Sequence, residues 1–167
     1  RRGALGITYE DETLRLIENA RSQGVDVTCD VDIYPLLFDD SCLFDLNSFY
    51  NVPMPFRSAT DREALWQGLE SGTVNAISVN HDPVLRQDKE VNFEDAVPGA
   101  VSLEVALPAI WKPLSERLGA ARAVELLSTA PAQLAGVAAS ELAMGKPANV
   151  VFLNEDKPLD VGTSLFA

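Results

Sequence analysis

Apolar residues recur along the first part of the chain with two different spacings. In residues 10–24 they follow a helical spacing, and Gly24 stands where such a helix would end. This helical face carries Leu14, Ile17 and Ala20. Residues 25–31 change to an alternation of apolar and polar positions, which is typical of a strand with one buried face. The region therefore predicts a helix followed by a strand.

The same order of elements then repeats. Residues 60–72 predict a second helix, which we expect Thr60 and Glu63 to open as a capping box and Gly72 to close. The apolar run at 74–79 predicts a second strand.

The C-terminal half has a mainly helical pattern. Residues 100–111 form an apolar helical run, which we expect Pro108 to kink or break. Residues 120–136 fit one helix, or two helices separated at Pro131. Nearer the C-terminus, the run NVVFL at 149–153 predicts a short strand.

This alternation of helices and strands indicates the α/β class. Long loops, 32–58 and 80–98, follow the two clear strands. Loops at the carboxyl ends of parallel strands carry the chemistry of such folds, so these two loops are the candidate site. There are too few strands to close an eight-stranded barrel, and we therefore expect part of a (β/α)8 TIM-type barrel.

The net charge of the chain limits the kinds of binding partner that we expect. The chain has 25 Asp and Glu residues against 13 Lys and Arg, a net charge of −12. This excess of negative charge disfavours nucleic acid and anionic membranes as partners. No apolar run approaches the ~20 residues of a membrane-spanning helix.

The cysteines and the N-terminal residues indicate the cellular compartment in which we expect the protein. Cys29 and Cys42 fit neither a CxxC pair nor a secreted disulfide framework, so we expect free thiols and a cytoplasmic protein. The opening RRGALGITYEDE lacks the apolar core of a signal peptide. It also lacks an initiator Met, which suggests that the sequence begins partway through a longer chain.

Some groups of residues could have a function, but a structural role explains them more simply. An aspartate group could hold a hard metal ion, but its spacing matches no EF-hand. We expect Asp39 and Asp40, ahead of Ser41, to cap or solvate a turn instead. The members of the aspartate group are Asp30, Asp32, Asp39 and Asp40. Trp66 and Trp111 fall on helical faces, where we expect packing or an interface anchor.

Five segments in order resemble the dihydroorotases, which are cyclic-amide hydrolases of the amidohydrolase superfamily. They are VTCDVDIYPLLFDD, PMPFRSATDREALWQGLESGTVNAISVNHDP, EVNFEDAVPGAVSLEVALP, LSTAPAQLAG and GKPANVVFLNED. The resemblance implies that residues 1–140 form the C-terminal part of the amidohydrolase (β/α)8 barrel. It also implies that residues 141–167 begin the small β segment that flanks the barrel.

The same resemblance implies a metal-bound hydroxide, but the residues depart from the family pattern. Where the family has Thr-Pro-His-His, with a metal-ligand histidine, residues 32–35 are Asp-Ile-Tyr-Pro. Where it has Asn-Pro-Pro-Leu-Arg for the substrate carboxylate, residues 53–57 are Pro-Met-Pro-Phe-Arg. Where it has Asp-His-Ala-Pro-His, residues 80–84 are Asn-His-Asp-Pro-Val.

The change at Asn80 is the most serious, because a carboxamide neither holds a metal nor accepts a proton well. A hydrolytic zinc site needs three or more His or carboxylate ligands, and His81 is the one histidine of the chain. We therefore expect no catalytic residue, no metal ligand and no cofactor, with Asn80 as the degenerate position.

Two retained residues remain candidates for substrate binding. Arg57 could clamp a carboxylate, or it could form a surface ion pair with Asp61 or Glu63. His81 could contact substrate, or it could pack in its loop or bond to Asp82.

Three functions follow from this pattern. The first is a non-catalytic dihydroorotase-like protein of pyrimidine biosynthesis, a structural subunit for the assembly of aspartate carbamoyltransferase. The second is an active, zinc-dependent dihydroorotase whose main metal ligands lie in a missing N-terminal part. The third is a binding module that senses a small anionic pyrimidine precursor. A homo-oligomer is compatible with all three.

Overall fold

A three-stranded parallel sheet lies at the centre of the computed structural model, which describes residues 4–8, 10–138 and 141–157. The strands are β1 (Ala4–Thr8), β2 (Val27–Asp32) and β3 (Ala76–Ser78), in the order β1-β2-β3. The register pairs Thr8 with Val31, and Asp32 with Ser78. The carboxyl ends of β2 and β3 therefore lie side by side.

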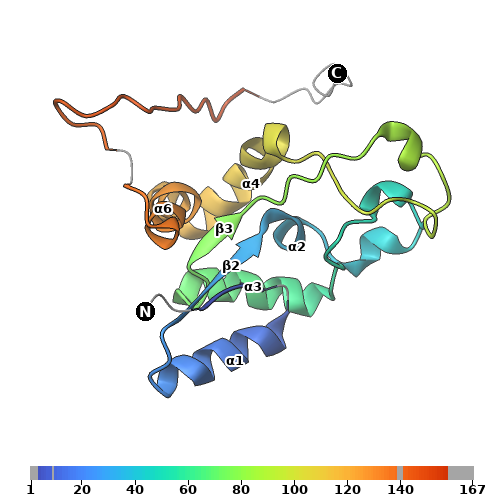
Figure 1. Cartoon of the computed structure of the whole chain (residues 1–167), viewed down its shortest axis with the longest axis horizontal. Helices are drawn as coiled ribbons and strands as arrows, with labels where there is room; N and C mark the ends of the chain where they lie inside the picture. The colour runs from blue at the N-terminus through green and yellow to red at the C-terminus, as the bar shows by residue number, and fades with distance from the viewer. Residues whose placement is uncertain (1–3, 9, 139–140, 158–167) are drawn as a thin grey trace.

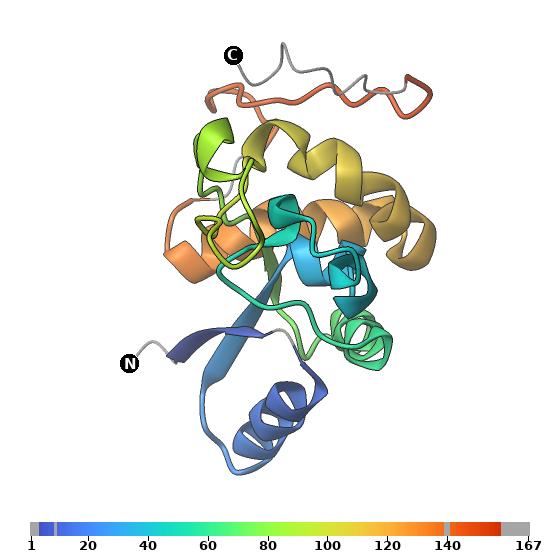
Figure 2. The ribbon, with the colours of Figure 1, turned by 90° about the vertical axis from the view of Figure 1, so that its right-hand side faces the viewer.

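Helices connect the strands and cover them. The longer ones are α1 (Asp11–Ser22), α3 (Ala59–Ser71) and α4 (Leu103–Leu118). The last helical run consists of α5 (Ala120–Val124), the π-helical η4 (Glu125–Thr129) and α6 (Ala130–Ala135). Helix α1 lies below the strands, and α4 lies above them, in both Figure 1 and Figure 2. Figure 2 shows α3 to one side of the strands. The α/β alternation predicted from the sequence is confirmed.

One apolar core joins the sheet to the helices. The strand side chains in this core alternate along β2, where Cys29 and Val31 are fully buried. Helix α3 contributes Leu65 and Leu69. Gly68, on the same helix, allows close packing, because a Cβ there would lie 2.9 Å from a methyl group of Val74.

The N-terminus of α3 differs from the prediction. Ser58 is the N-cap, and its Oγ accepts the N–H of Asp61 at 3.2 Å and donates to the Asp61 carboxylate at 2.6 Å. The predicted Thr60 and Glu63 box is wrong, because the capping position lies two residues earlier. Gly72 ends the helix with φ +84°, as the sequence predicted.

The prolines do not break the helices. Helix α4 continues through Pro108 and Pro113. Ile110 and Leu114 of this helix are fully buried, and this packing offsets the backbone hydrogen bonds that the prolines cannot make. The last helical run also continues through Pro131, at the start of α6. The π turn comes just before this proline, and there the Ala130 N–H bonds to the Glu125 carbonyl.

The chain between the strands and α4 is built from short helices. These are α2 (Ile33–Leu37), η1 (Asp40–Leu43), η2 (Ser48–Tyr50) and η3 (Arg86–Asp88). They occupy the two loops that the sequence predicted to be long.

The tail differs most from expectation. Residues 141–157 contain neither helix nor strand, so the strand predicted at 149–153 is wrong. A strand requires a partner, and no described segment pairs with this one. The indole N–H of Trp111, on α4, donates to the Glu155 carboxylate of this tail at 2.8 Å. The predicted boundary at residue 140 stays a prediction, and residues 158–167 lie outside the described part.

Within the described ranges, no helix combines the length and hydropathy needed to cross a membrane.

Candidate functional site

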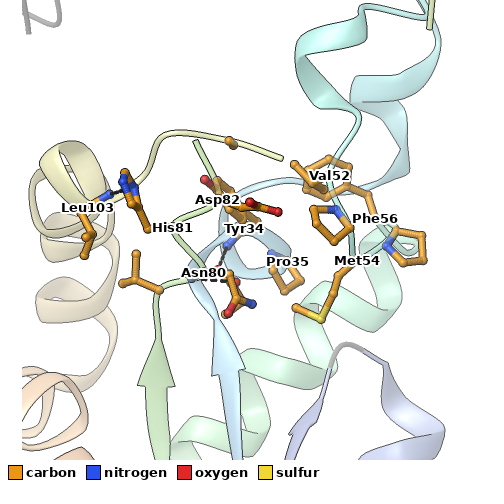
Figure 3. A pocket seen from close by; sticks show the side chains of 14 residues that line it. Tyr34, Pro35, Val52, Met54, Phe56, Asn80, His81, Asp82 and Leu103 are labelled. Atoms are coloured by element: carbon orange, nitrogen blue, oxygen red, sulfur yellow. Dashed lines mark hydrogen bonds between the residues drawn. The ribbon is translucent and has the colours of Figure 1, made fainter. Parts of the chain in front are cut away.

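A cavity of about 670 Å³ opens at the carboxyl ends of β2 and β3. Figure 3 shows one wall formed by His81 and Leu103, and the opposite wall formed by Val52, Met54 and Phe56. The remaining lining residues are Asp32, Tyr34, Pro35, Pro53, Pro55, Val79, Asn80, Asp82 and Ala100. The cavity thus lies where the sequence placed the candidate site, between the two long loops.

Asp32 supplies a buried carboxylate to this cavity. It is the last residue of β2, it is fully buried, and it caps α2 by accepting the Tyr34 N–H at 3.2 Å. Its other oxygen accepts the backbone N–H of Asn80, also at 3.2 Å. Burial raises the pKa of Asp32, and the hydrogen bonds from Tyr34 and Asn80 only partly oppose that rise. Asp32 was expected only as one of the aspartate group and as part of the departure from the family pattern at residues 32–35, so this role was not predicted.

Asn80 faces that carboxylate from the end of β3. Besides its backbone N–H, its side-chain amide lowers the pKa of Asp32 through a further hydrogen bond. A carboxamide suits this place because it can donate to a carboxylate, which a second carboxylate cannot do. Relative to the family pattern, the carboxylate has moved from the end of β3 to the end of β2.

His81 caps a helix. Its Nδ1 accepts the backbone N–H groups of Ser102 and Leu103, at 3.2 and 3.3 Å, at the start of α4. Figure 3 shows the ring turned toward that helix and away from Asn80. Because Nδ1 is an acceptor, the neutral ring carries its proton on Nε2. His81 also lines the cavity, so contact with a substrate stays a prediction.

Arg57 is not among the residues that line the cavity. Its guanidinium forms an ion pair with Glu10 at 3.2 Å. The positive charge of Arg57 also contributes to lowering the pKa of Asp61, one of the two partners that the simpler interpretation expected. Its neighbour Phe56 lies in the cavity wall, so the backbone runs past the site while the charged group bonds elsewhere. The role of Arg57 in substrate binding stays a prediction.

The charge of the cavity has one sign. Among the described lining residues, Asp32 and Asp82 are carboxylates and none is a lysine or arginine. The rest of the wall is mainly apolar. As described, the cavity favours a neutral or cationic group over a carboxylate.

The donor set does not fit a hydrolytic zinc ion. Within the described ranges, no three His, Cys, Asp or Glu side chains are grouped so as to hold a metal ion. In the cavity itself, Nδ1 of His81 is already bonded to two N–H groups and Asn80 supplies an amide. The described residues thus do not form such a centre by themselves.

Asp39, one of the aspartate group, is engaged in local contacts. Asp39 accepts from the hydroxyl and the N–H of Ser41 and forms an ion pair with Arg62 at 2.8 Å. These contacts hold the pKa of Asp39 below its usual value, with the Ser41 hydroxyl as the largest cause. Asp39 therefore caps η1, as the sequence predicted for this turn.

Both cysteines are free thiols in the structure. Cys29 lies in the core and donates to the carbonyl of Thr73 at 3.2 Å, and burial raises its pKa. Burial also raises the pKa of Cys42. Neither thiol has the lowered pKa of an activated nucleophile.

Solved structures define the class to which this fold belongs. The L-hydantoinase (dihydropyrimidinase) of Arthrobacter aurescens aligns with 79% of the chain at 28% identity and a TM-score of 0.69, over 31% of its own length. The D-hydantoinase (dihydropyrimidinase) of a Thermus species aligns with 87% of the chain at 19% identity and a TM-score of 0.75, over 34% of its length. The chain therefore has the fold of part of a TIM-barrel amidohydrolase.

Sequence relatives narrow this class. The dihydroorotase of Deinococcus radiodurans is 32% identical over 153 residues, and that of a Geobacter strain is 35% identical over 150 residues. A dihydroorotase-like protein of Pseudomonas aeruginosa is 32% identical over 155 residues. These alignments cover 92%, 88% and 92% of this chain. The chain is a dihydroorotase-like member of the amidohydrolase superfamily.

The match is to part of those proteins. The chain spans 37%, 35% and 37% of the length of the same three relatives. No family model matches the sequence.

Proposed function

We propose that this chain belongs to a dihydroorotase-like protein of pyrimidine biosynthesis that does not hydrolyse cyclic amides and instead supports the assembly of aspartate carbamoyltransferase. The observation that carries the proposal is the bonding at the cavity. Asn80 donates to the buried Asp32, and His81 caps α4 through Nδ1. Both residues are engaged in holding the structure together.

The chemistry supports a loss of hydrolysis. An attacking water needs a group that takes its proton, and the amide of Asn80 cannot do so. Asp32 is a carboxylate, but it is fully buried and accepts hydrogen bonds from its own backbone neighbourhood. Without catalysis, a retained barrel serves to present surfaces, which is what an assembly subunit requires.

An active, zinc-dependent dihydroorotase is the second candidate. It is favoured by the names of the relatives, since those of Deinococcus and Geobacter are both called dihydroorotases. The chain spans 37% of the Deinococcus protein, so a separate part of the protein could supply the metal ligands. A sensor of an anionic precursor is less well supported, because the described lining carries carboxylates and no cation.

Three measurements on the natural full-length protein test the proposal. Metal analysis should find almost no zinc, and a dihydroorotate hydrolysis assay should give no turnover. Aspartate carbamoyltransferase of the same organism should co-purify with the protein and should lose assembly or activity without it. Bound zinc together with turnover would establish the active enzyme instead.

A further inference from the structure

The chain between β3 and α4 starts and ends at one junction, because residues on its two sides are bonded together. The Asp82 N–H donates to the carbonyl of Ala100 at 3.0 Å. The hydroxyl of Ser102 donates to the carbonyl of Asn80 at 2.8 Å. Gly99 allows this close approach, because a Cβ there would lie 2.6 Å from the carbonyl oxygen of Asp82. The end of β3 and the start of α4 are therefore fixed side by side.

The ring of His81 adds two further hydrogen bonds at this junction, and we call these two bonds the latch. Nδ1 of the ring accepts the N–H groups of Ser102 and Leu103, at 3.2 and 3.3 Å. Ser102 is the N-cap of α4, and its side chain makes no capping bond to the helix. The latch thus supplies an acceptor to N–H groups that have no partner within the helix. It requires a lone pair on Nδ1, and hence a neutral ring.

Protonation of the ring removes the latch. A charged imidazole has two N–H donors and no acceptor, so Nδ1 would face the two backbone N–H groups as a third donor. Its positive charge would also lie at a helix N-terminus, where the macrodipole disfavours a cation. Histidine is the side chain that ordinarily changes charge between about pH 5 and about pH 8, so mildly acidic conditions can bring this about.

Titratable acidic groups around the ring offer a charged imidazole another position. They are Asp82, next in the chain, Asp32 and the phenol of Tyr34, which line the same cavity, and Glu104, in the first turn of α4. The ammonium of Lys89 interacts with Asp82, which partly offsets the lowering of the Lys89 pKa by burial. The described lining residues of the opposite wall have no titratable side chain. The carboxylates of the cavity therefore attract a protonated ring away from the end of α4.

We propose that His81 is an acid-sensitive switch in the wall of the cavity. When neutral, its ring fixes the first turn of α4, and Leu103 with it, against the end of β3. When protonated, the ring releases the two N–H groups and turns toward Asp82 and Asp32. His81 and Leu103 form one wall of the cavity (Figure 3), so this release changes the shape of that wall. The switch goes beyond the proposed function, because it depends on neither hydrolysis nor assembly.

Residue-resolved hydrogen exchange of the full-length protein, from about pH 7.5 to about pH 5.5, tests the switch. After correction for the intrinsic exchange rate at each pH, protection of the Ser102 and Leu103 amides should fall about tenfold on acidification. The amide of Asp82 is the internal control, because its bond to Ala100 does not involve the ring and its protection should stay constant. Constant protection of Ser102 and Leu103 would overturn the switch, whatever any variant shows.

Two variants identify the titrating group. His81→Asn offers an amide oxygen in place of Nδ1 but does not titrate, so its protection of the two amides should be the same at both ends of the pH range. His81→Ala should lack that protection throughout. Thermal unfolding at each pH establishes that the variants are folded and that the loss is local. A fall in His81→Asn as large as that in the parent would assign the pH dependence to another group and refute the switch.

Discussion

Nδ1 of His81 accepts the backbone N–H of Ser102 at 3.2 Å, which joins the end of β3 to the start of α4. The first N–H groups of a helix have no partner within the helix, and Ser102 makes no side-chain cap of its own. Instead, the Ser102 hydroxyl donates to the carbonyl of Asn80 at 2.8 Å. The lone histidine therefore has a structural role at the rim of the cavity.

Replacing His81 should test this capping role. His81→Ala should lower the free energy of unfolding by about 1 kcal/mol, the usual cost of losing a helix cap. His81→Asn should retain much of that stability, because the amide oxygen can occupy the place of Nδ1 and accept the same N–H groups. Urea denaturation of the two variants and the parent measures the difference. Equal losses in both variants would show that the ring matters through packing and not through its acceptor.

A second prediction concerns the exchange of roles between Asp32 and Asn80. Asn80→Asp should not create dihydroorotate hydrolysis, because the ligand histidines of the family pattern are also absent from this stretch. It should lower stability by about 1 kcal/mol, since it replaces a donor to a buried carboxylate with a like charge. A dihydroorotate hydrolysis assay of the single variant tests the expected absence of activity, and urea denaturation measures the expected loss of stability.

The double variant is the control for this pair. Asp32→Asn combined with Asn80→Asp again sets one amide against one carboxylate and should recover part of the lost stability. Turnover in the single Asn80→Asp variant would contradict the view that several changes together disable the site. Failure of the double variant to recover stability would show that the two side chains are not coupled.

The elements with clear periodicity were predictable, and those that depend on distant partners were not. The helical spacing of Leu14 and its apolar neighbours predicts helix α1. The alternation of apolar and polar residues up to Val31 predicts strand β2. Strand β1 was missed, because ALGIT is short and becomes a strand through its pairing with Val27 and the residues that follow. The opposite error occurred at NVVFL, whose β propensity finds no partner among the described residues.

The position of the site was predictable, but its bonding was not. Asn80 and His81 follow a strand and therefore had to lie at a sheet end. Nothing local indicates that His81 bonds to Ser102, 21 residues further along the chain. Arg57 was expected near the site, yet its guanidinium pairs with Glu10, and Asp32 was missed because its burial depends on the neighbouring strand.

A third prediction concerns the pH dependence of stability, because the folded protein raises the pKa of Asp32 and lowers the pKa of Asp39. The folded protein raises the pKa of Asp32, so its ionisation costs stability, and that cost grows as pH rises through the folded-state pKa. Asp32→Asn should therefore gain stability relative to the parent as pH rises from about 4 toward neutrality.

Asp39 should give the opposite trend in the same experiment. Its pKa is lowered in the folded state, so its contribution is present above the ordinary carboxyl pKa and is lost as pH falls through the folded-state pKa. Asp39→Asn should lose stability relative to the parent at neutral pH, and the difference should disappear in acid. Thermal unfolding of both variants from about pH 2 to neutrality checks the signs. Parallel curves for the two variants would rule out the assigned shifts.

The fourth prediction concerns the clamp that holds α4 on α3. The guanidinium of Arg117 bonds to both Glu63 and Glu70, with one of its contacts to Glu63 at 3.0 Å, and lies 5.2 Å from the ring centre of Trp66. These carboxylates raise the pKa of Arg117, with the hydrogen bonds to Glu63 as the largest cause. A lysine keeps the charge but loses the planar, forked geometry.

Arg117→Lys should therefore lower the free energy of unfolding by about 1 kcal/mol, after allowing for screening of these partly exposed groups. Lys112→Ala is the matched control, because Lys112 forms an exposed pair with Glu116 on the same helix and should change stability little. Urea denaturation at low and high salt separates the contributions: the ionic part of the Arg117 effect falls with salt, while the stacking on Trp66 persists. A loss that vanishes completely in high salt would show that the stacking contributes nothing to the clamp.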